Sequence, residues 1–224
     1  MASAEQPDEL LYATALSLCE GVGPKLQAAL LAEFQTPQKV LSQSAETLQS
    51  VRGIGSRTAA ALAEPTLLDQ AREVLLECRQ LDIDVIPRSH ADYPRRLPEI
   101  CDPPAILYRR GVLLPQDELA IAIVGSRRCT TYGRRQSERL SGALSRAGFT
   151  IVSGLARGID AAAHRGALQA GGRTLAVLAS GVRDIYLPEH KELAAEISLQ
   201  GALLSEMPIH QRPLPGLFPQ RNRI

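Results

Sequence analysis

The sequence has few of the residues that mark metal sites, disulfide frameworks or membrane segments. It contains no tryptophan, and its four cysteines (Cys19, Cys78, Cys101 and Cys129) are scattered without a C-x-x-C pair, which argues against zinc or disulfides and fits a reducing cytoplasm. No apolar run approaches the roughly 20 residues that cross a bilayer. The start, MASAEQPDELL, lacks the basic-then-apolar layout of a secretion signal. We therefore expect a cytoplasmic protein with no membrane segment, metal or cofactor.

The remaining composition is that of a globular protein with an uneven charge distribution. The chain has 224 residues, 45% of them apolar and 22% charged, which is enough for two domains with a sizeable core. Its net charge of +1 hides a net charge of −6 in residues 1–120, +8 in 121–183 and −1 in 184–224. All ten basic residues of 121–183 are arginines. This local excess of positive charge indicates a binding site for a polyanion.

Residues 1–80 are predicted to form a small all-α domain. Apolar residues occur at helical spacing on both sides of Gly21-Val22-Gly23, and the arrangement repeats at Gly53-Ile54-Gly55. Two copies of this pattern indicate a tandem helix-hairpin-helix, or SAM-like, domain, in which the glycines allow tight turns whose N–H groups can face a phosphate. Because the segment is acidic, a structural or protein-binding role is favoured over binding of duplex DNA.

The rest of the chain reads as a connector followed by an α/β domain. Residues 81–118 are rich in proline, which forbids long helices, and contain two short strands, the second of which (AILYRRG) is expected to add to the edge of the following sheet. In 119–224, strands alternate with helices, which predicts a Rossmann-like open parallel sheet. The expected strands are 119–125, 149–153, 174–179 and 201–205, and the expected helices are 133–147, 158–170 and 189–199. The last residues, FPQRNRI, show no helical pattern.

Two turns in this α/β segment carry the strongest chemical signal. LAIAIVGSRRCTTYG and FTIVSGLARGID each lead from an apolar strand into a Gly/Ser/Arg turn at the start of a helix. In an open parallel sheet both turns lie at the carboxyl edge, where ligands bind. The N–H groups of the helix starts favour phosphate oxygens. The two turns therefore predict a site for a ligand with several phosphates.

Several motifs together resemble the DNA-processing protein A (DprA/Smf) family. They are AIVGSR with Tyr132-Gly133, SGLARGID at 153–160, TLAVLASGV, LLSEMP at 203–208 and FPQRNRI at 218–224, in the family's order across nearly the whole chain. The resemblance implies a homodimer that binds and protects single-stranded DNA and loads the RecA recombinase onto it during natural transformation and recombination. Because family members continue past R-N-R-I, we expect this chain to be cut short at its C-terminus.

By motif, the resemblance also assigns DNA contacts to three turns and to the C-terminal element. The assigned residues are Gly125, Ser126 and Arg127; Ser153, Gly154 and Arg157; Gly181 and Arg183; and Phe218, Arg221, Asn222 and Arg223. The third loop departs from the family at Ala179, Leu187 and His190, which leaves its contacts open. Arginine grips phosphate bidentately and stacks on bases, so phosphate contacts are expected to dominate in a chain with few aromatic residues.

No pattern predicts a catalytic group. Asp160 and His164 have i, i+4 spacing, but we expect Asp160 to tie the turn and His164 to pack beneath the loop. Tyr132 is expected to be a packing or loop-fixing residue. The alternative to a non-enzymatic binding module is a Rossmann-like nucleotide-binding enzyme, such as a nucleoside-phosphate hydrolase. The chain lacks the P-G-G-x-G-T turn and the downstream glutamate of those hydrolases.

Overall fold

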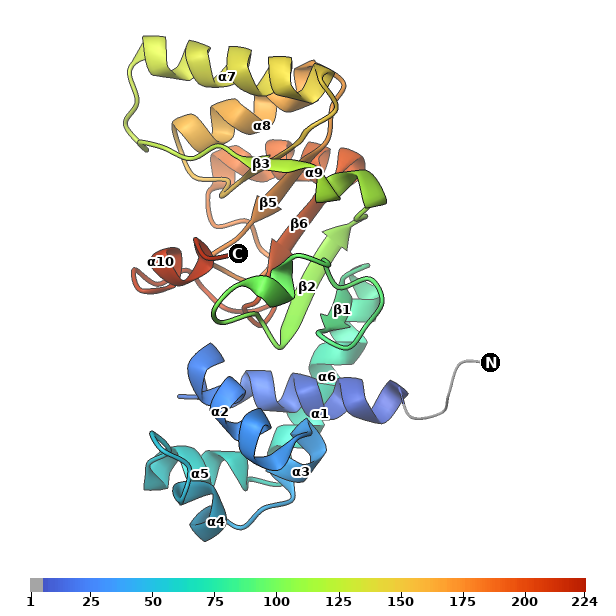
Figure 1. Cartoon of the computed structure of the whole chain (residues 1–224), viewed down its shortest axis with the longest axis vertical. Helices are drawn as coiled ribbons and strands as arrows, with labels where there is room; N and C mark the ends of the chain where they lie inside the picture. Colours follow the sequence, from blue (N-terminus) through green and yellow to red (C-terminus); the bar gives the residue numbers. More distant parts are fainter. Residues whose placement is uncertain (1–5) are drawn as a thin grey trace. The chain divides into compact units, whose positions relative to one another are not determined.

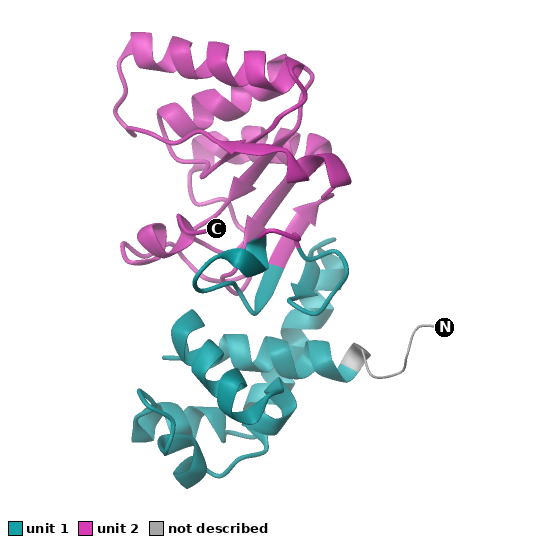
Figure 2. Cartoon of the chain, viewed as in Figure 1, with its two compact units in different colours: residues 1–93, 97–107 teal, residues 94–96, 108–224 magenta. Residues whose placement is uncertain are grey.

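The computed structural model describes residues 6–224, which divide into two compact units (Figures 1 and 2). Unit 1 runs through Tyr93 and includes Leu97–Leu107, and unit 2 comprises Pro94–Arg96 and Tyr108–Ile224. Residues 1–5, which belong to the predicted 1–80 domain and to the segment compared with secretion signals, lie outside the described residues. The division into 1–80, 81–118 and 119–224 stays a prediction about domains.

Unit 1 is mainly helical, as its sequence predicts. Its elements are α1 (Gln6–Leu18), α2 (Pro24–Phe34), α3 (Pro37–Leu41), α4 (Ala45–Gln49), α5 (Ser56–Leu62), α6 (Thr66–Gln80), β1 (Asp84–Pro87) and the 3-10 turn η1 (Leu97–Glu99). Gly21 and Gly53 have φ angles of 85° and 94°, which glycine adopts without steric cost, and each starts the turn before a helix. The core of the unit includes one fully buried aliphatic residue from each of the helices α1 to α5, which are Leu16, Leu30, Val40, Leu48 and Leu62.

Unit 2 alternates strands and helices. Its elements are η2 (Pro115–Glu118), β3 (Ala120–Ala122), α7 (Thr131–Arg146), β4 (Thr150–Ser153), α8 (Ile159–Gln169), β5 (Thr174–Val177), η3 (Pro188–His190), α9 (Lys191–Gln200), β6 (Ala202–Ser205) and α10 (Leu217–Arg221). The strand β2 (Ile106–Gly111) spans the boundary between the units. The six-stranded sheet has the order β1-β2-β6-β5-β4-β3.

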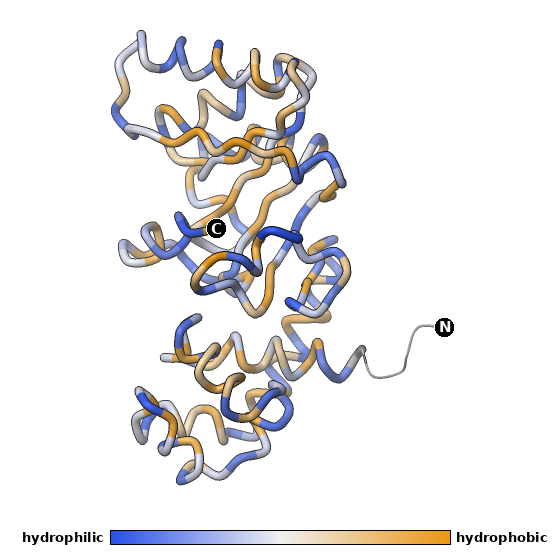
Figure 3. The backbone as a smooth tube through the Cα atoms, viewed as in Figure 1, coloured by the Kyte–Doolittle hydropathy of each residue, from blue (hydrophilic) through white to orange (hydrophobic). Residues whose placement is uncertain are grey.

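The parallel part of the sheet positions the loops that follow its strands. β3, β4, β5 and β6 are parallel neighbours, with Ile121 opposite Ile151 and Ala176 opposite Leu203. Helices α7 and α8 pack on the face that carries Ile123 and Ile151, where they bury a small apolar cluster. Apolar residues follow the strands in Figure 3, whereas α7 alternates between hydrophobic and hydrophilic positions. The loops after β3, β4 and β5 therefore meet at one edge.

The Rossmann-like prediction and the placement of AILYRRG are confirmed, and two local expectations are wrong. AILYRRG, as β2, adds to the edge of the parallel strands by pairing antiparallel with β6, and β1 lies beyond it, so the complete sheet is mixed. The FPQRNRI segment contributes to α10, which is too short to produce a helical repeat and tolerates Pro219 in its first turn. Tyr132 is 73% exposed because it occupies the outer side of the first turn of α7. Within residues 6–224, no helix has the length and apolar character that spanning a membrane requires.

Candidate nucleic-acid interface

A pocket of about 130 Å³ opens where β4 and β5 end. Two arginines and two aromatic rings contribute to its wall, together with backbone and apolar side chains of the loops after β3, β4 and β5. The lining residues are Arg127, Gly154, Leu155, Ala156, Arg157, Leu178, Ala179, Ser180, Ile185, Tyr186, Leu187, Pro213 and Phe218. The pocket therefore lies at the carboxyl edge of the parallel strands, as the two turns predict.

The first turn presents Arg127 to this pocket. The Arg127 guanidinium carbon lies 4.5 Å from the centroid of the Phe218 ring, a cation–π distance. The backbone of the turn is fixed by Ser126, whose hydroxyl accepts a hydrogen bond from the Arg128 N–H (3.1 Å) and whose carbonyl accepts one from Ile159 N–H (3.2 Å). The second bond joins the first turn to the start of α8. Arg127 is exposed and has no acidic partner among the described residues, so its N–H groups are available to an anion.

The second turn is organised around a buried carboxylate. Asp160 is 5% exposed, and its Oδ2 accepts hydrogen bonds from the N–H groups of Gly154 (3.2 Å) and Ala156 (3.4 Å). This confirms the expectation that Asp160 ties the turn, and it means that the carboxylate takes the place a phosphate oxygen would have at these amides. Ser153 is buried and donates its hydroxyl hydrogen to the Ile123 carbonyl (2.6 Å), which links β4 to the chain after β3.

Arg221 fastens α10 to the ends of β4 and β5. Its Nη1 donates to the carbonyl oxygens of Gly154 (3.0 Å) and Val177, and its Nε donates to the Asn222 side chain (3.0 Å). Burial, together with the nearby Arg127 charge, lowers the pKa of the Arg221 guanidinium from its ordinary value, while Asp160 opposes that shift. Because its Nη1 bonds two strand-end carbonyls, Arg221 acts in this structure as a clamp that brings Phe218 to the pocket.

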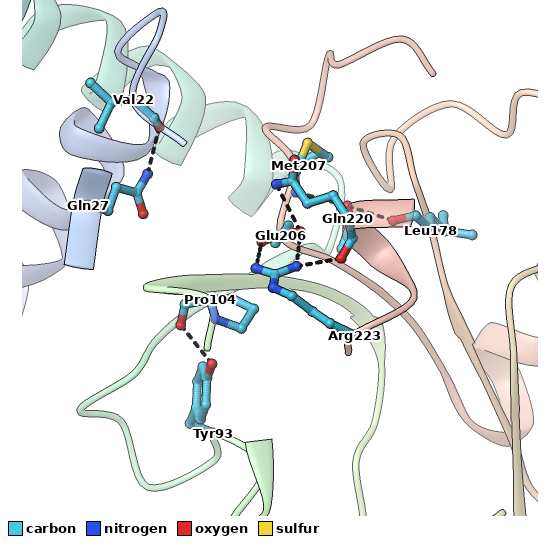
Figure 4. A network of polar contacts seen from close by, with 10 residues as sticks. Val22, Gln27, Tyr93, Pro104, Leu178, Glu206, Met207, Gln220 and Arg223 are labelled. Carbon is cyan, nitrogen blue, oxygen red and sulfur yellow. Dashed lines mark hydrogen bonds and ion pairs between the residues drawn. The ribbon is translucent and has the colours of Figure 1, made fainter. Parts of the chain in front are cut away.

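Arg223 makes a second clamp on the same segment, shown in Figure 4. Its guanidinium binds the Glu206 carboxylate through both oxygens, at 2.6 Å and 2.5 Å, and Gln220 donates to the same carboxylate (3.2 Å). The side chains of Glu206 and Arg223 are 5% and 20% exposed. Glu206 follows β6, so the pair joins the C-terminal residues to the end of that strand.

The remaining sequence-assigned residues lie beside the pocket rather than in its wall. Gly181 N–H donates to the Gln211 carbonyl (2.9 Å), and a Cβ at Gly181 would lie 2.1 Å from the Ile209 carbonyl oxygen. Arg183 pairs with His210 (2.7 Å between Nη1 and Nδ1). Gly125, Ser126, Ser153, Asn222 and the two clamp arginines, Arg221 and Arg223, are likewise outside the lining. The structure brings Arg127, Gly154, Arg157 and Phe218 together in one wall.

Arg157 faces the pocket with its guanidinium already paired. Its Nε and Nη2 both lie 2.6 Å from Oε1 of Glu189, a residue of η3. Tyr186, two residues before η3, is 61% exposed and offers an accessible ring at the mouth of the pocket. Sequence reasoning missed both Glu189 and Glu206, since neither belongs to a phosphate-type turn and each meets its arginine only in the folded chain.

Two buried histidines lie under the second turn. His164 is fully buried and its Nδ1 lies 2.7 Å from Thr174 Oγ1, which itself donates to the Ile151 carbonyl. The imidazole must therefore be the donor in this contact, which makes Nδ1 the protonated nitrogen. Burial and the neighbouring His190 and Arg221 charges lower the pKa of His164 to about 3, so it is neutral. His190 bonds the Leu155 carbonyl through Nδ1 (2.9 Å). Both histidines pack beneath the loop, as expected for His164.

This fold and site define a class: a Rossmann-like α/β protein with an arginine- and aromatic-walled pocket at the carboxyl edge of its sheet. The sequence profile of the family described as DNA recombination-mediator protein A matches residues 84–224, and that of the SAM-like helix-hairpin-helix tandem matches residues 14–64. The chain belongs to the DNA recombination-mediator protein A family.

Similar proteins support this membership along the whole chain. Protein Smf of Synechocystis sp. is 37% identical over 228 residues, covering 100% of this chain and 56% of the relative. DNA processing protein DprA of Bacillus subtilis is 36% identical over 214 residues, covering 95% of this chain and 72% of the relative. This chain thus spans a little over half the length of the Synechocystis relative.

Two solved structures share the fold. The X-ray structure of DNA processing protein A from Streptococcus pneumoniae aligns with a TM-score of 0.74 and 28% identity, covering 100% of this chain and 74% of the other. DNA processing protein A from Helicobacter pylori aligns with a TM-score of 0.56 and 30% identity, covering 63% of each chain. The Helicobacter structure is described as giving insights into that protein's unique single-stranded DNA binding mode.

Proposed function

We propose that this chain binds single-stranded DNA without sequence preference and acts in DNA processing for natural transformation and recombination. Family membership and the binding described for the Helicobacter protein support this function. The finer parts of the proposal are that the protein protects the strand, loads RecA recombinase onto it, works as a homodimer and resides in the cytoplasm. These parts rest on the family resemblance, and they refer to the activity of the whole protein.

The observation that carries the proposal is the composition of the pocket wall. Arg127 and Arg157 supply guanidinium groups that match phosphate oxygens, while Phe218 and Tyr186 supply ring faces. Binders of single strands combine these two elements, a cationic groove for the backbone and flat surfaces for the bases. A duplex keeps its bases stacked inside, so it cannot use the ring faces. The arrangement therefore favours unpaired strands.

We also propose that the site binds without catalysing a reaction. Among the described residues that line the pocket there is no carboxylate, imidazole or thiol to serve as base or nucleophile. Asp160 is used by the Gly154 and Ala156 amides, and His164 is neutral and buried. No observation favours the nucleoside-phosphate hydrolase alternative.

Within this proposal the sequence-assigned residues divide into two groups. Arg127, Arg157 and Phe218 contact the strand directly, whereas Gly154 lines the pocket with its N–H bonded to Asp160 and its carbonyl bonded to Arg221. The others, Gly125, Ser126, Ser153, Gly181, Arg183, Arg221, Asn222 and Arg223, hold the loops and the C-terminal segment that form the wall. Direct contact of this second group with DNA stays a prediction from the resemblance.

Fluorescence polarisation with labelled oligo-dT and with a duplex of equal length, at several salt concentrations, tests the proposal. We expect oligo-dT to bind more tightly, and Arg127→Ala to weaken its binding by about tenfold or more because a charge-assisted contact is lost. The slope of log K against log salt should become shallower by about 0.7. Arg146→Ala is the matched control. Arg146 is exposed in the last turn of α7, whereas Arg127 lies just before the first turn of the same helix. Equal affinity of the two variants, or tighter duplex binding, contradicts the proposal.

A further inference from the structure

Arg127 and Arg157 differ in how they present their charge. The Arg127 guanidinium lies over the Phe218 ring at 4.5 Å, so its N–H edges stay open. The Arg157 guanidinium is bound by Glu189, which accepts both Nε and Nη2 at 2.6 Å. The Nε and Nη2 edge is the same fork that a phosphate uses in bidentate binding. A phosphate at this edge must therefore replace the carboxylate.

The position of Glu189 opposite Arg157 is built into the fold. His190 is 4% exposed, and its Nδ1 lies 2.9 Å from the Leu155 carbonyl oxygen, with which it forms a hydrogen bond. Leu155 lies in the loop after β4, two residues before Arg157, so this contact fixes η3 beside that loop. The Glu189 carboxylate receives its own backbone N–H and the Arg157 guanidinium, both of which lower its pKa from the ordinary value, so it is ionised at neutral pH.

We propose that Glu189 is an internal competitor for DNA: it holds Arg157 in the free protein, and a phosphate of the strand displaces it on binding. The pair is largely exposed, with side-chain exposures of 61% and 45%, so water and salt weaken it and an incoming phosphate can exchange with it. Glu189 thus sets the affinity of the pocket below what its two arginines would give alone. This inference rests on the proposed function.

The test compares Glu189→Gln with Glu192→Gln by oligo-dT polarisation at low salt. Both variants remove one negative charge, and both residues border the groove between α8 and α9, but Glu192 has no ion pair in the described part of the chain. We expect E189Q to bind oligo-dT about two- to five-fold more tightly than E192Q. The same pair of substitutions is then made in an Arg157→Ala background, where the advantage of E189Q over E192Q should vanish because no arginine remains to be released.

The outcomes separate the two proposals. Binding of oligo-dT by the unsubstituted chain with equal affinities for E189Q and E192Q overturns the competitor inference and leaves the proposed function intact. Weaker binding by E189Q shows that Glu189 orients Arg157 productively, which also overturns it, as does an advantage that persists without Arg157. Failure of the unsubstituted chain to bind oligo-dT overturns both proposals.

Discussion

Replacing Arg223 with alanine is expected to destabilise unit 2 by about 3 kcal/mol. The substitution leaves the Glu206 carboxylate, whose side chain is 5% exposed, without the two guanidinium contacts at 2.6 Å and 2.5 Å. Breaking a buried pair by removing one partner typically costs about 3–5 kcal/mol. The lower end applies because Arg223 is 20% exposed and water can reach the carboxylate once the side chain is gone. For a chain of this size, the melting temperature should fall by about 6–12 °C.

Urea unfolding followed by circular dichroism measures this loss. Arg212→Ala is the matched control, because Arg212 is an exposed arginine of the same C-terminal segment and should change stability by less than about 0.5 kcal/mol. A second variant tests the cause: Glu206→Gln removes the stranded charge, so the double variant E206Q/R223A should be more stable than R223A alone. Equal stabilities for R223A and R212A, or no rescue by E206Q, would refute the clamp role of Arg223.

Asp117, Gly181 and Asp160 each make contacts whose loss should change the stability of the chain. Burial alone would raise the pKa of Asp117, but hydrogen bonds from Arg173, Leu114 N–H and Thr150 outweigh burial and lower the pKa. The contribution of the ionised Asp117 to the free energy of unfolding is therefore full above about pH 4 and is lost as the pH falls further. In an acid titration of stability, the Asp117→Asn variant should not show that loss. Gly181→Ala should cost about 1–3 kcal/mol, because its Cβ would meet the Ile209 carbonyl, whereas Gly216→Ala, with open space around it, should be neutral in the same urea assay. Asp160→Ala should cost about 2 kcal/mol by leaving the Gly154 and Ala156 amides unpaired, and a cost no larger than that of the exposed Asp184→Ala would contradict this role.

The strand and helix order of unit 2 could be predicted because its signals are local. Each strand is a short apolar run and each following helix has its own periodicity, so β4 (predicted 149–153, observed 150–153) and α8 (predicted 158–170, observed 159–169) differ from expectation only at their ends. The role of Asp160 was predictable for the same reason, since it bonds amides only four and six residues away. A contact between residues that are close together in the sequence can be predicted from the sequence itself.

The parts that could not be predicted depend on pairs far apart in the chain. A motif identifies Arg157 and Arg223 as arginines of the site, but it does not say whether their guanidinium groups are free. Glu189 lies 32 residues from Arg157, and Glu206 lies 17 residues from Arg223, with no repeat that links them. Helix α10 was missed for a related reason, because contacts of Arg221 with strand-end carbonyls hold this five-residue helix in place.

A crystal structure of the chain with a short oligo-dT would decide whether unpaired DNA occupies the edge of the sheet. We expect phosphate oxygens about 3 Å from the Arg127 and Arg157 guanidinium groups, a base against Phe218 or Tyr186, and Glu189 no longer bound to Arg157. A strand seated on the helices of unit 1 or along the outer face of α7, with the pocket empty, would contradict the assignment of this site.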